Sequence, residues 1–325
     1  MKRHLISALL ILAACVASGA AMAAAADSYP ERPVKLIVGF QPGGPTDLIG
    51  RLIAQKLSEE TGKNFIIENL PGAGGNVGAG RVAQSAPDGY TLLVTGGNLN
   101  NNPFLYSHVP YDALKSFDAV TLAGETPVVL AVNPSVPAHS VKELVALIRA
   151  TPNKYSFASP GTGTPPQLVG SLFKQTLNLD LVHVPFDGGG VAVEATVGGH
   201  TPISFGALAP ALPLIKSGQL RALAVTGKER APSLPDVPTM AEAGFPEVVG
   251  STWTAVVAPA GTPKDIIAKL HDLIVKGLAQ PDVKAKLASM AYVGIGNSPE
   301  ECTQFFKDET ATWGKVIKDA GLHAE

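Results

Sequence analysis

The sequence predicts an α/β fold in two domains, each with a mainly parallel sheet flanked by helices. The first observation behind this prediction is that short β-rich runs alternate with helical patterns, as they do in βαβ units. The runs lie at residues 34–40, 65–68, 91–94, 128–132, 155–158, 182–184, 203–205, 220–225 and 255–258. The second is the length of 325 residues, which is enough for two domains with separate cores. The third is a strand, loop and helix start that occurs once in each half.

Residues 1–26 have the pattern of a signal peptide for export. Lys2 and Arg3 precede an apolar stretch, and Ala21-Met22-Ala23 fits an A-x-A cleavage site. An alternative is that Cys15, in the sequence L-A-A-C, is a lipoprotein attachment site. We favour ordinary cleavage, which leaves Cys302 as the one cysteine of the mature chain. No later stretch reaches the roughly 18 apolar residues of a membrane span, so we expect an exported, soluble protein.

Composition and charge exclude other classes. Charged residues make up 16% of the chain and hydrophobic residues 46%, which is typical of a compact protein and not of a disordered one. The net charge of −2 and the absence of a Lys/Arg run argue against a nucleic-acid partner.

The repeated unit places a polar loop before a helix in each half. Loop 40–47 precedes apolar residues at helical spacing: Leu48, Ile49, Leu52, Ile53 and Leu57. Loop 159–166 precedes a matching set: Leu168, Val169, Leu172, Phe173 and Leu177. Both loops therefore end at a helix N-terminus, where backbone N–H groups have no internal partner and the helix dipole is positive. We expect each loop to hold an oxyanion, so that the two domains form a clamp.

Two apolar stretches are candidates for crossings between the domains. Residues 120–134 lead to a helix at 141–149, and residues 250–259 lead to a helix at 264–279. If the chain crosses twice, residues 27–128 and 250–325 form one discontinuous lobe and residues 129–249 form the other. Twin crossings of this kind act as a hinge.

Catalytic and metal-binding motifs are not found. The sequence has no G-x-S-x-G, Walker A or H-E-x-x-H motif. Its histidines beyond the leader show no i,i+4 pair that would hold a metal on a helix. The glycine-rich stretch 71–80 has Val77 where a dinucleotide fingerprint needs glycine, so we interpret it as a tight turn and a close-packed helix entry. We expect no catalytic residue, no metal and no cofactor.

Several polar residues near strand ends are candidate ligand contacts. Asp47 would either fix a ligand ammonium or pair with Arg51 and hold the loop, and Thr46 would either cap the helix or face the ligand. Asn98, Asn100, Asn101 and Asn102 are interpreted as a polar loop after the strand at 91–94. The segment 186–190 offers an aromatic wall and flexible backbone donors.

Together these segments resemble the Bug-type extracytoplasmic solute receptors of tripartite tricarboxylate transporters. The motifs are F-x-P-G-G-P-T-D at 40–47, E-N-L-P-G-A-G-G at 68–75, P-D-G-Y-T-L at 87–92, P-Y-D at 110–112, H-V-P-F at 183–186, L-R-A-L-A-V-T at 220–226, L-P-D-V-P-T at 234–239 and A-P-A-G-T-P at 258–263. They follow one another in order over nearly all of the mature chain.

The resemblance implies a two-domain periplasmic binding protein of the Venus-flytrap type, similar to type II. It implies a receptor without catalytic activity that closes on a small carboxylate or related solute and delivers it to membrane subunits. We expect a monomer. The ligand-binding residues implied by the matching loops and by the candidates above are Phe40, Gly43, Gly44, Thr46, Asp47, Asn98, Ser159, Gly161, Thr162, Gly163, Thr164, Phe186, Asp187 and Gly206.

The chain departs from the family pattern at the second loop. Gln167 replaces the usual histidine and follows Pro165-Pro166, Phe186 replaces a tyrosine, and Asp187 stands where a basic residue is common. An acidic residue there disfavours a second ligand carboxylate and favours an ammonium or hydroxyl, which points away from tricarboxylates. Two alternatives stay open: a binding protein associated with a sensor, and an enzyme, a hydrolase or transferase, using the same cleft.

Overall fold

The computed structural model describes residues 28–186 and 188–324. The predicted leader with Cys15, and the predicted contact Asp187, lie outside these residues. The strands are β1 (Val34–Val38), β2 (Phe65–Asn69), β3 (Thr91–Thr95), β4 (Phe117–Val132), β5 (Ser156–Ser159), β6 (Val182–Pro185), β7 (Ile203–Ala207), β8 (Arg221–Val225), β9 (Ser251–Pro259) and β10 (Val293–Gly294). The helices are α2 (Pro45–Thr61), η1 (Ala73–Gly75), α3 (Asn76–Ala83), α4 (Asn98–Leu105), α5 (Val141–Ala150), α6 (Pro165–Thr176), α7 (Gly189–Val197), α8 (Leu208–Lys216), α9 (Lys264–Leu278), α10 (Pro281–Ser289) and α11 (Pro299–Ala320).

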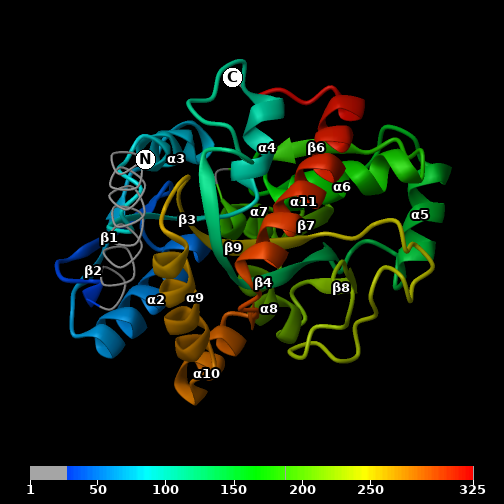
Figure 1. Cartoon of the computed structure of the whole chain (residues 1–325). Coiled ribbons are helices and arrows are strands. Elements are labelled where there is room, and N and C mark those ends of the chain that lie inside the picture. The colour runs from blue at the N-terminus through cyan, green and yellow to red at the C-terminus, as the bar shows by residue number, and fades with distance from the viewer. Residues whose placement is uncertain (1–27, 187, 325) are drawn as a thin grey trace, which may run out of the picture.

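The strands form one curled sheet with two similar halves (Figure 1). Its order is β2-β1-β3-β9-β4-β7-β5-β6, and β8 and β10 pair with β4. We call β2, β1, β3 and β9 the first half of the sheet and β7, β5, β6 and β8 the second half; β4 belongs to both. The α/β fold class is confirmed.

Among the strand pairs of the described residues, parallel pairing involves three strands in each half. β1 pairs parallel with β2 and β3, and β5 pairs parallel with β6 and β7. The pairs between them, β3–β9, β9–β4, β4–β7 and β4–β8, are antiparallel. The expectation of mainly parallel sheets therefore holds for the outer strands. It misses the centre, where β4 and β9 run past each other in opposite directions.

The long strand β4 joins the halves. It pairs with β9 as far as Pro127, opposite Ser251, and with β7 from Val128, opposite Ala207. Its change of partner falls beside the predicted lobe border at 128/129, and β9 begins beside the predicted return at 250. The division into lobes at these borders stays a prediction.

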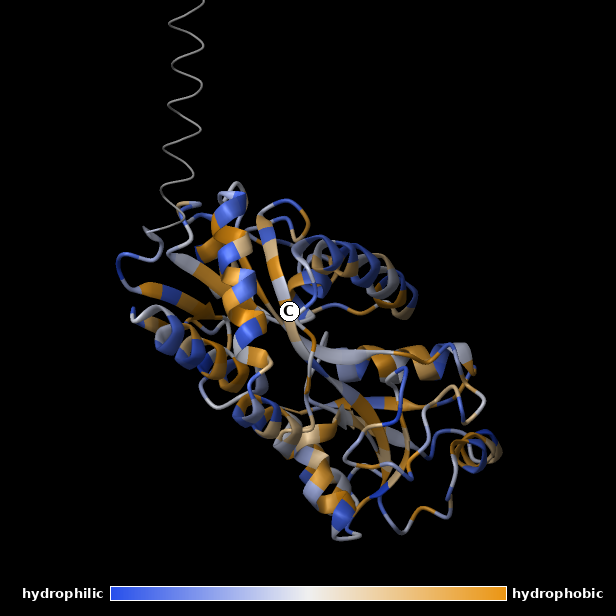
Figure 2. Ribbon diagram, turned by 60° about the horizontal axis from the view of Figure 1, so that its bottom comes forward, coloured by the Kyte–Doolittle hydropathy of each residue, from blue (hydrophilic) through white to orange (hydrophobic). Residues whose placement is uncertain are grey.

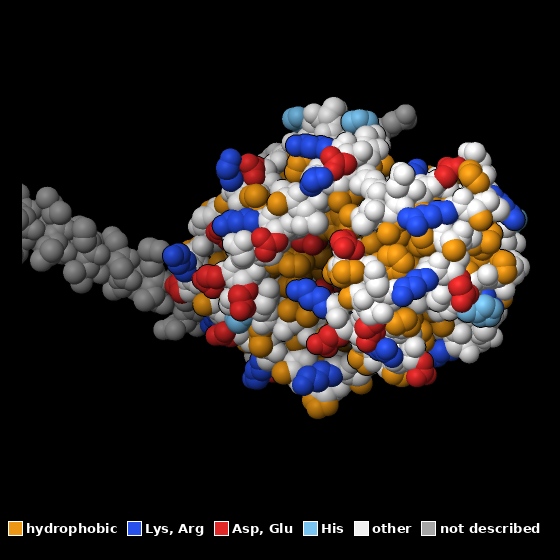
Figure 3. All heavy atoms as spheres, turned by 90° about the vertical axis from the view of Figure 1, so that its right-hand side faces the viewer, with side chains coloured by type: hydrophobic (Ala, Val, Ile, Leu, Met, Phe, Trp, Pro, Cys, Tyr) orange, Lys and Arg blue, Asp and Glu red, His pale blue; other side chains and the backbone are white. Residues whose placement is uncertain are grey.

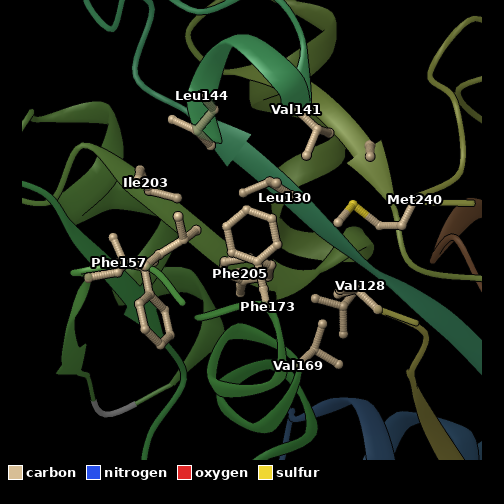
Figure 4. Packing of buried hydrophobic residues seen from close by; sticks show 14 of the residues in the cluster. Val128, Leu130, Val141, Leu144, Phe157, Val169, Phe173, Ile203, Phe205 and Met240 are labelled. Atoms are coloured by element: carbon tan, nitrogen blue, oxygen red, sulfur yellow. The ribbon is translucent and has the colours of Figure 1, made fainter. Parts of the chain in front are cut away.

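Each half of the sheet has its own buried clusters. Figure 4 shows one cluster of the second half, in which the rings of Phe157, Phe173 and Phe205 pack under Leu130 and Ile203. The centroid of the Phe205 ring lies 5.5 Å from those of Phe157 and Phe173. Figure 2 shows the general arrangement: hydrophobic residues concentrate on the strands, and the helices have an apolar side and a polar side. Rings packed this tightly fix the strand ends that carry the loops.

Local sequence signals explain where the helices begin and end. α2 has Pro45 at its first position and ends at Gly62, whose φ of 69° is the left-handed conformation that glycine adopts without strain. α5 begins at Ser140, whose hydroxyl accepts from the Glu143 N–H. α11 begins with a capping box between Ser298 and Glu301. It packs against α4, α6 and β4.

Two glycine- and asparagine-rich segments behave differently from each other. The stretch 71–80 forms η1 and the entry to α3, and a Cβ on Gly78 would lie 2.9 Å from the Gly39 Cα, so the predicted close-packed helix entry is confirmed. The predicted polar loop of asparagines is wrong, because Asn98 to Asn102 form the first turns of α4, and Asn100, Asn101 and Asn102 are buried. Their side chains are held by distant parts of the chain, a tertiary effect that overrides the turn preference of asparagine.

Within residues 28–186 and 188–324, no helix is long and apolar enough to cross a membrane. In the same residues Cys302 is a buried free thiol, and burial raises the pKa of that thiol to about 12.

Candidate functional site

The first loop is held by Asp47, in the first turn of α2. The Gly43 N–H donates to Asp47 Oδ2 at 2.9 Å. Arg51 donates to both carboxylate oxygens from Nε and Nη2, at 2.9 and 3.0 Å, and Asn69 Nδ2 donates to Oδ1 at 2.9 Å. Asn69 also donates to the Phe40 carbonyl at 3.0 Å, so one network fixes both ends of the loop.

This network accounts for the charge of Asp47. The side chain is 1% exposed, and burial alone would raise its pKa. The hydrogen bonds from Arg51, Gly43 and Asn69 outweigh burial and lower the pKa. Since both carboxylate oxygens of Asp47 accept hydrogen bonds within the network, the side chain fixes the loop. This is the second of its two predicted roles, in which it pairs with Arg51 and holds the loop.

The first loop keeps several donors free. Helix α2 has no side-chain cap, and its first turn leaves the N–H groups of Thr46 and Asp47 without an acceptor inside the helix. Within the described residues, no acceptor is found for the Gly44 N–H or the Thr46 hydroxyl either. Three N–H groups and a hydroxyl at the positive end of a helix form a site suited to a carboxylate.

The second loop repeats the same bond with a neutral side chain. The Gly163 N–H donates to Gln167 Oε1 at 3.1 Å, and Gln167 Nε2 donates to the Ser171 hydroxyl at 2.9 Å. Gly163, Gln167 and Ser171 lie 120 positions after Gly43, Asp47 and Arg51. Both glycines have positive φ, 89° at Gly43 and 77° at Gly163. The two loops therefore correspond in their hydrogen bonds as well as in the spacing of the apolar residues that follow them.

At the positions that match Gly44, Thr46 and Asp47, the second loop has fewer free donors than the first. Pro165 and Pro166 occupy the first two positions of α6 and have no N–H. The Thr164 N–H and hydroxyl both donate to the Gly161 carbonyl, at 3.4 and 2.7 Å. Of the positions that match the first loop's donors, Gln167 alone keeps an N–H without an acceptor inside the helix.

A half-buried histidine supports the start of the second loop. His183 Nε2 lies 2.7 Å from the Ser159 hydroxyl, which also contacts the N–H and carbonyl of Gly161 at 3.3 Å. Burial, with a smaller contribution from Lys174, lowers the pKa of His183 to about 4, so the ring is neutral near pH 7. Ser159 is fully buried, and its hydroxyl holds the loop.

Helix α4 brings the two loops together. Asn101 Nδ2 donates to the Gly163 carbonyl at 3.3 Å, and a Cβ on Gly97 would lie 2.9 Å from Pro165 Cγ. A Cβ on the preceding Gly96 would lie 4.0 Å from Thr46 Oγ1. The Gly96-Gly97 pair at the end of β3 therefore lies close to both loops.

A small cavity lies beside the first loop. Its volume is about 10 Å³, near the lower limit for one water molecule, and Phe40, Thr95, Asn98, Asn102 and Tyr111 contribute to its lining. Asn98 is half-buried there. Phe40 packs against Gly75, where a Cβ would lie 3.2 Å from Phe40 Cζ. Two of the predicted contacts, Phe40 and Asn98, thus meet at one place.

The remaining predicted contacts belong to the second half of the sheet. Thr162 is exposed, and the Phe186 carbonyl would lie 3.4 Å from a Cβ on Gly161. The Phe186 N–H donates to the Ser159 carbonyl at 3.0 Å. Gly206 lies inside β7 opposite Val129, and a Cβ there would be 3.7 Å from Val193 Cγ2. Phe186 thus adjoins the loop, while the atoms nearest a Cβ on Gly206 belong to Ser204 and Val193, outside the loop.

A larger groove, of about 980 Å³, lies elsewhere. It runs between α10, β10 and residues 227–233, and includes none of the residues of the two loops. Basic and acidic side chains are interspersed on the face shown in Figure 3. Within the described residues, no group of three or more His, Cys, Asp or Glu side chains could hold a metal ion.

Comparison with known proteins identifies the family. Residues 49–322 match the tripartite tricarboxylate transporter family receptor. The chain belongs to this receptor family. BugT of Bordetella pertussis (strain Tohama I) is 35% identical to this receptor over 306 residues, which cover 94% of each chain. The predicted resemblance is confirmed.

Solved structures show the same fold. Rpa4515 of R. palustris, solved with adipate, is 33% identical, with a TM-score of 0.81 and coverage of 91% of this receptor and 99% of Rpa4515. MatC from Rhodopseudomonas palustris, solved with bound malate, is 33% identical, with a TM-score of 0.76 and coverage of 89% and 100%.

Sequence reasoning missed two residues that hold the second loop and gave a third another role. His183 and Gln167 were not among the expected contacts, whereas Asn101 was one of the asparagines considered as ligand contacts; all three hold the second loop. The spacing of 120 residues between Asp47 and Gln167 was a signal for one of them. The contact of Asn101 depends on how α4 packs across the sheet, which no local pattern predicts.

Proposed function

We propose that this protein is a periplasmic receptor that captures a small carboxylate between the two loops and delivers it to membrane subunits of a tripartite transporter. The observation that carries the proposal is that two helix starts, at Thr46 and Pro165, both lie close to Gly96-Gly97. Free N–H groups at the first start are suited to a carboxylate without a buried arginine. Adipate in Rpa4515 and malate in MatC are both carboxylates, which supports the proposal.

The receptor closes by a hinge at β4 and β9. In this proposal residues 27–128 and 250–325 form one lobe and residues 129–249 the other, with the crossings where β4 changes partner and where β9 begins. A solute that contacts both loops stabilises the closed state by the difference between its affinities for the two states. The closed form is then the signal that the membrane subunits recognise. The receptor acts as a monomer and catalyses no reaction.

A thermal-shift screen tests this function. The mature chain is unfolded and refolded to remove carried-over solute, then heated with aliphatic and aromatic carboxylates, amino acids and uncharged analogues. A ligand at a hundredfold excess over its dissociation constant stabilises the native state by about 2.7 kcal/mol. We expect a stability increase from one class of carboxylates. A response confined to uncharged compounds, or turnover of any compound, would contradict the proposal.

A further inference from the structure

We propose that the solute carries a carboxylate at the first loop and a neutral hydrogen-bond donor, a hydroxyl, at the second loop. The receptor would then prefer an ω-hydroxy monocarboxylate to the dicarboxylate of the same length. This inference rests on the proposed function and assigns the two ends of the solute to the two loops.

The first step is the difference in donors between the loops. At matching positions, Gly44, Thr46 and Asp47 keep free N–H groups, whereas Thr164 uses its N–H within the loop and Pro166 has none. Pro166 also stands where Thr46 supplies a hydroxyl. A carboxylate leaving water needs several donors to replace its hydration. Among these matching positions of the described residues, the second loop leaves only the Gln167 N–H free.

The second step concerns a buried hydrogen-bond acceptor beside the second loop, the side-chain oxygen of Asn101. Asn101 is 1% exposed, and its Nδ2 faces the Gly163 carbonyl, which orients the amide. Within the described residues, Asn101 Oδ1 has no hydrogen-bond partner. A buried oxygen left in this state favours a ligand group that donates and disfavours a second carboxylate, which would only accept.

The third step is the neutral charge of the second loop. In the first loop Asp47 is matched by Arg51, but their counterparts in the second loop are Gln167 and Ser171, both uncharged. His183, behind Ser159, is neutral near pH 7 because its pKa is lowered to about 4. None of these side chains supplies a positive charge that would offset the free-energy cost of desolvating a second carboxylate.

Matched acids test the assignment of the two ends. Isothermal titration would compare hexanoate, 6-hydroxyhexanoate and adipate, and the corresponding sets of four and eight carbons, on the refolded mature receptor. We expect the ω-hydroxy acid of the best length to bind at least about tenfold more tightly than the diacid, a difference of about 1.4 kcal/mol.

Variants of the second loop test whether its missing donors cause the preference for the hydroxy acid. Pro166→Thr gives the second loop the N–H and hydroxyl that Thr46 gives the first, and should bring the affinity ratio of hydroxy acid to diacid close to one. Pro166→Ala, which restores the N–H alone, should give part of this change. Pro281→Ala is the matched control, since it removes a proline from the first position of α10, outside both loops, and should leave the ratio unchanged.

The outcomes separate the two proposals. If no carboxylate binds at any length, the proposed function is wrong. If diacids bind as tightly as hydroxy acids or more tightly, the carboxylate function stands and the assignment of the two ends is overturned. An unchanged ratio in both folded Pro166 variants would likewise overturn the role of the missing donors.

Discussion

Asn101, on α4, donates from its side-chain amide to the carbonyl of Gly163, in the second loop, over 3.3 Å. The bond joins a helix that follows β3 to a loop that follows β5, one in each half of the sheet. It fixes the second loop beside the Gly96-Gly97 pair, whose other neighbour is Thr46. The bond thus connects the two halves of the sheet at a point close to both loops.

Gly163→Ala should destabilise the receptor and weaken ligand binding. A Cβ at this position would lie 2.3 Å from Leu105 Cδ1, and the φ of 77° disfavours any other residue. We expect a loss of about 2–4 kcal/mol in the free energy of unfolding, combining backbone strain with overpacking. Urea denaturation measures the loss.

Gly218→Ala is the control for this substitution. Gly218 has a φ of 76° and nothing within 4 Å of a Cβ. Only the strain of the left-handed backbone should therefore lower the free energy of unfolding, by about 1 kcal/mol. Equal losses in the two variants would show that Leu105 does not confine the loop.

Asp47→Asn should loosen the first loop. The substitution removes the charge that binds Arg51 and faces the Gly43 N–H, so we expect a loss of about 2–4 kcal/mol and at least a tenfold weaker carboxylate affinity. Asp319→Asn, in the exposed i,i+4 pair with Lys315, should cost less than about 0.5 kcal/mol.

The pH dependence of the Asp47 effect has a defined sign. Because the pKa of Asp47 is lowered in the folded state, its stabilisation is present above the ordinary value of 3.8 and is lost as the pH falls through the folded-state pKa. The stability difference between wild type and Asp47→Asn should therefore shrink in acid. A difference that grows on acidification would contradict the ion pair.

Gln167→Leu should affect the second loop alone. It leaves the Gly163 N–H and the Ser171 hydroxyl without their partner, inside a fully buried site. We expect a loss of about 1–3 kcal/mol in denaturant unfolding. Gln304→Leu, which removes an exposed bond to Asp308, is the matched control and should be nearly neutral. Similar values for the two variants would mean that Gln167 does not hold the loop.

His183 should make the receptor less stable in mild acid. Its pKa falls from 6.5 to about 4 on folding, so the unfolded state binds more protons between these values and stability drops as the pH falls from about 6.5 to 4. The drop should be about 2 kcal/mol after allowance for partial exposure of the ring. His183→Gln should flatten this part of the curve, whereas His108→Gln, at an exposed site, should keep it. The same slope in His183→Gln and wild type would assign the drop to another group.

The sequence predicted the outer strands, both loops and the starts of α2 and α6, because apolar periodicity, glycine and proline are local signals. It placed the Asp47–Arg51 pair by its spacing of four residues, which the structure confirms. It missed that β4 begins at Phe117 and that the asparagines form a helix. Those features depend on pairing with β9 and on partners such as Thr310 for Asn100, more than 200 residues away.

The site was predictable only in part, for the same reason. Gly43 and Gly163 stand out in the sequence as turn residues, but the bond from Asn101 and the support from His183 arise from strands and helices packing together. The Asn101 side-chain oxygen, which has no partner in the part of the chain that the structure describes, cannot be recognised without the fold, and the assignment of the solute ends depends on it.

A crystal structure of the receptor with its tightest carboxylate would test the central claim most directly. The account predicts one carboxylate within hydrogen-bond distance of the Thr46 and Asp47 N–H groups, with the rest of the solute reaching toward Gly163 across Gly96-Gly97. A carboxylate bound in the groove along α10, or held by the second loop while the first stays empty, would contradict it.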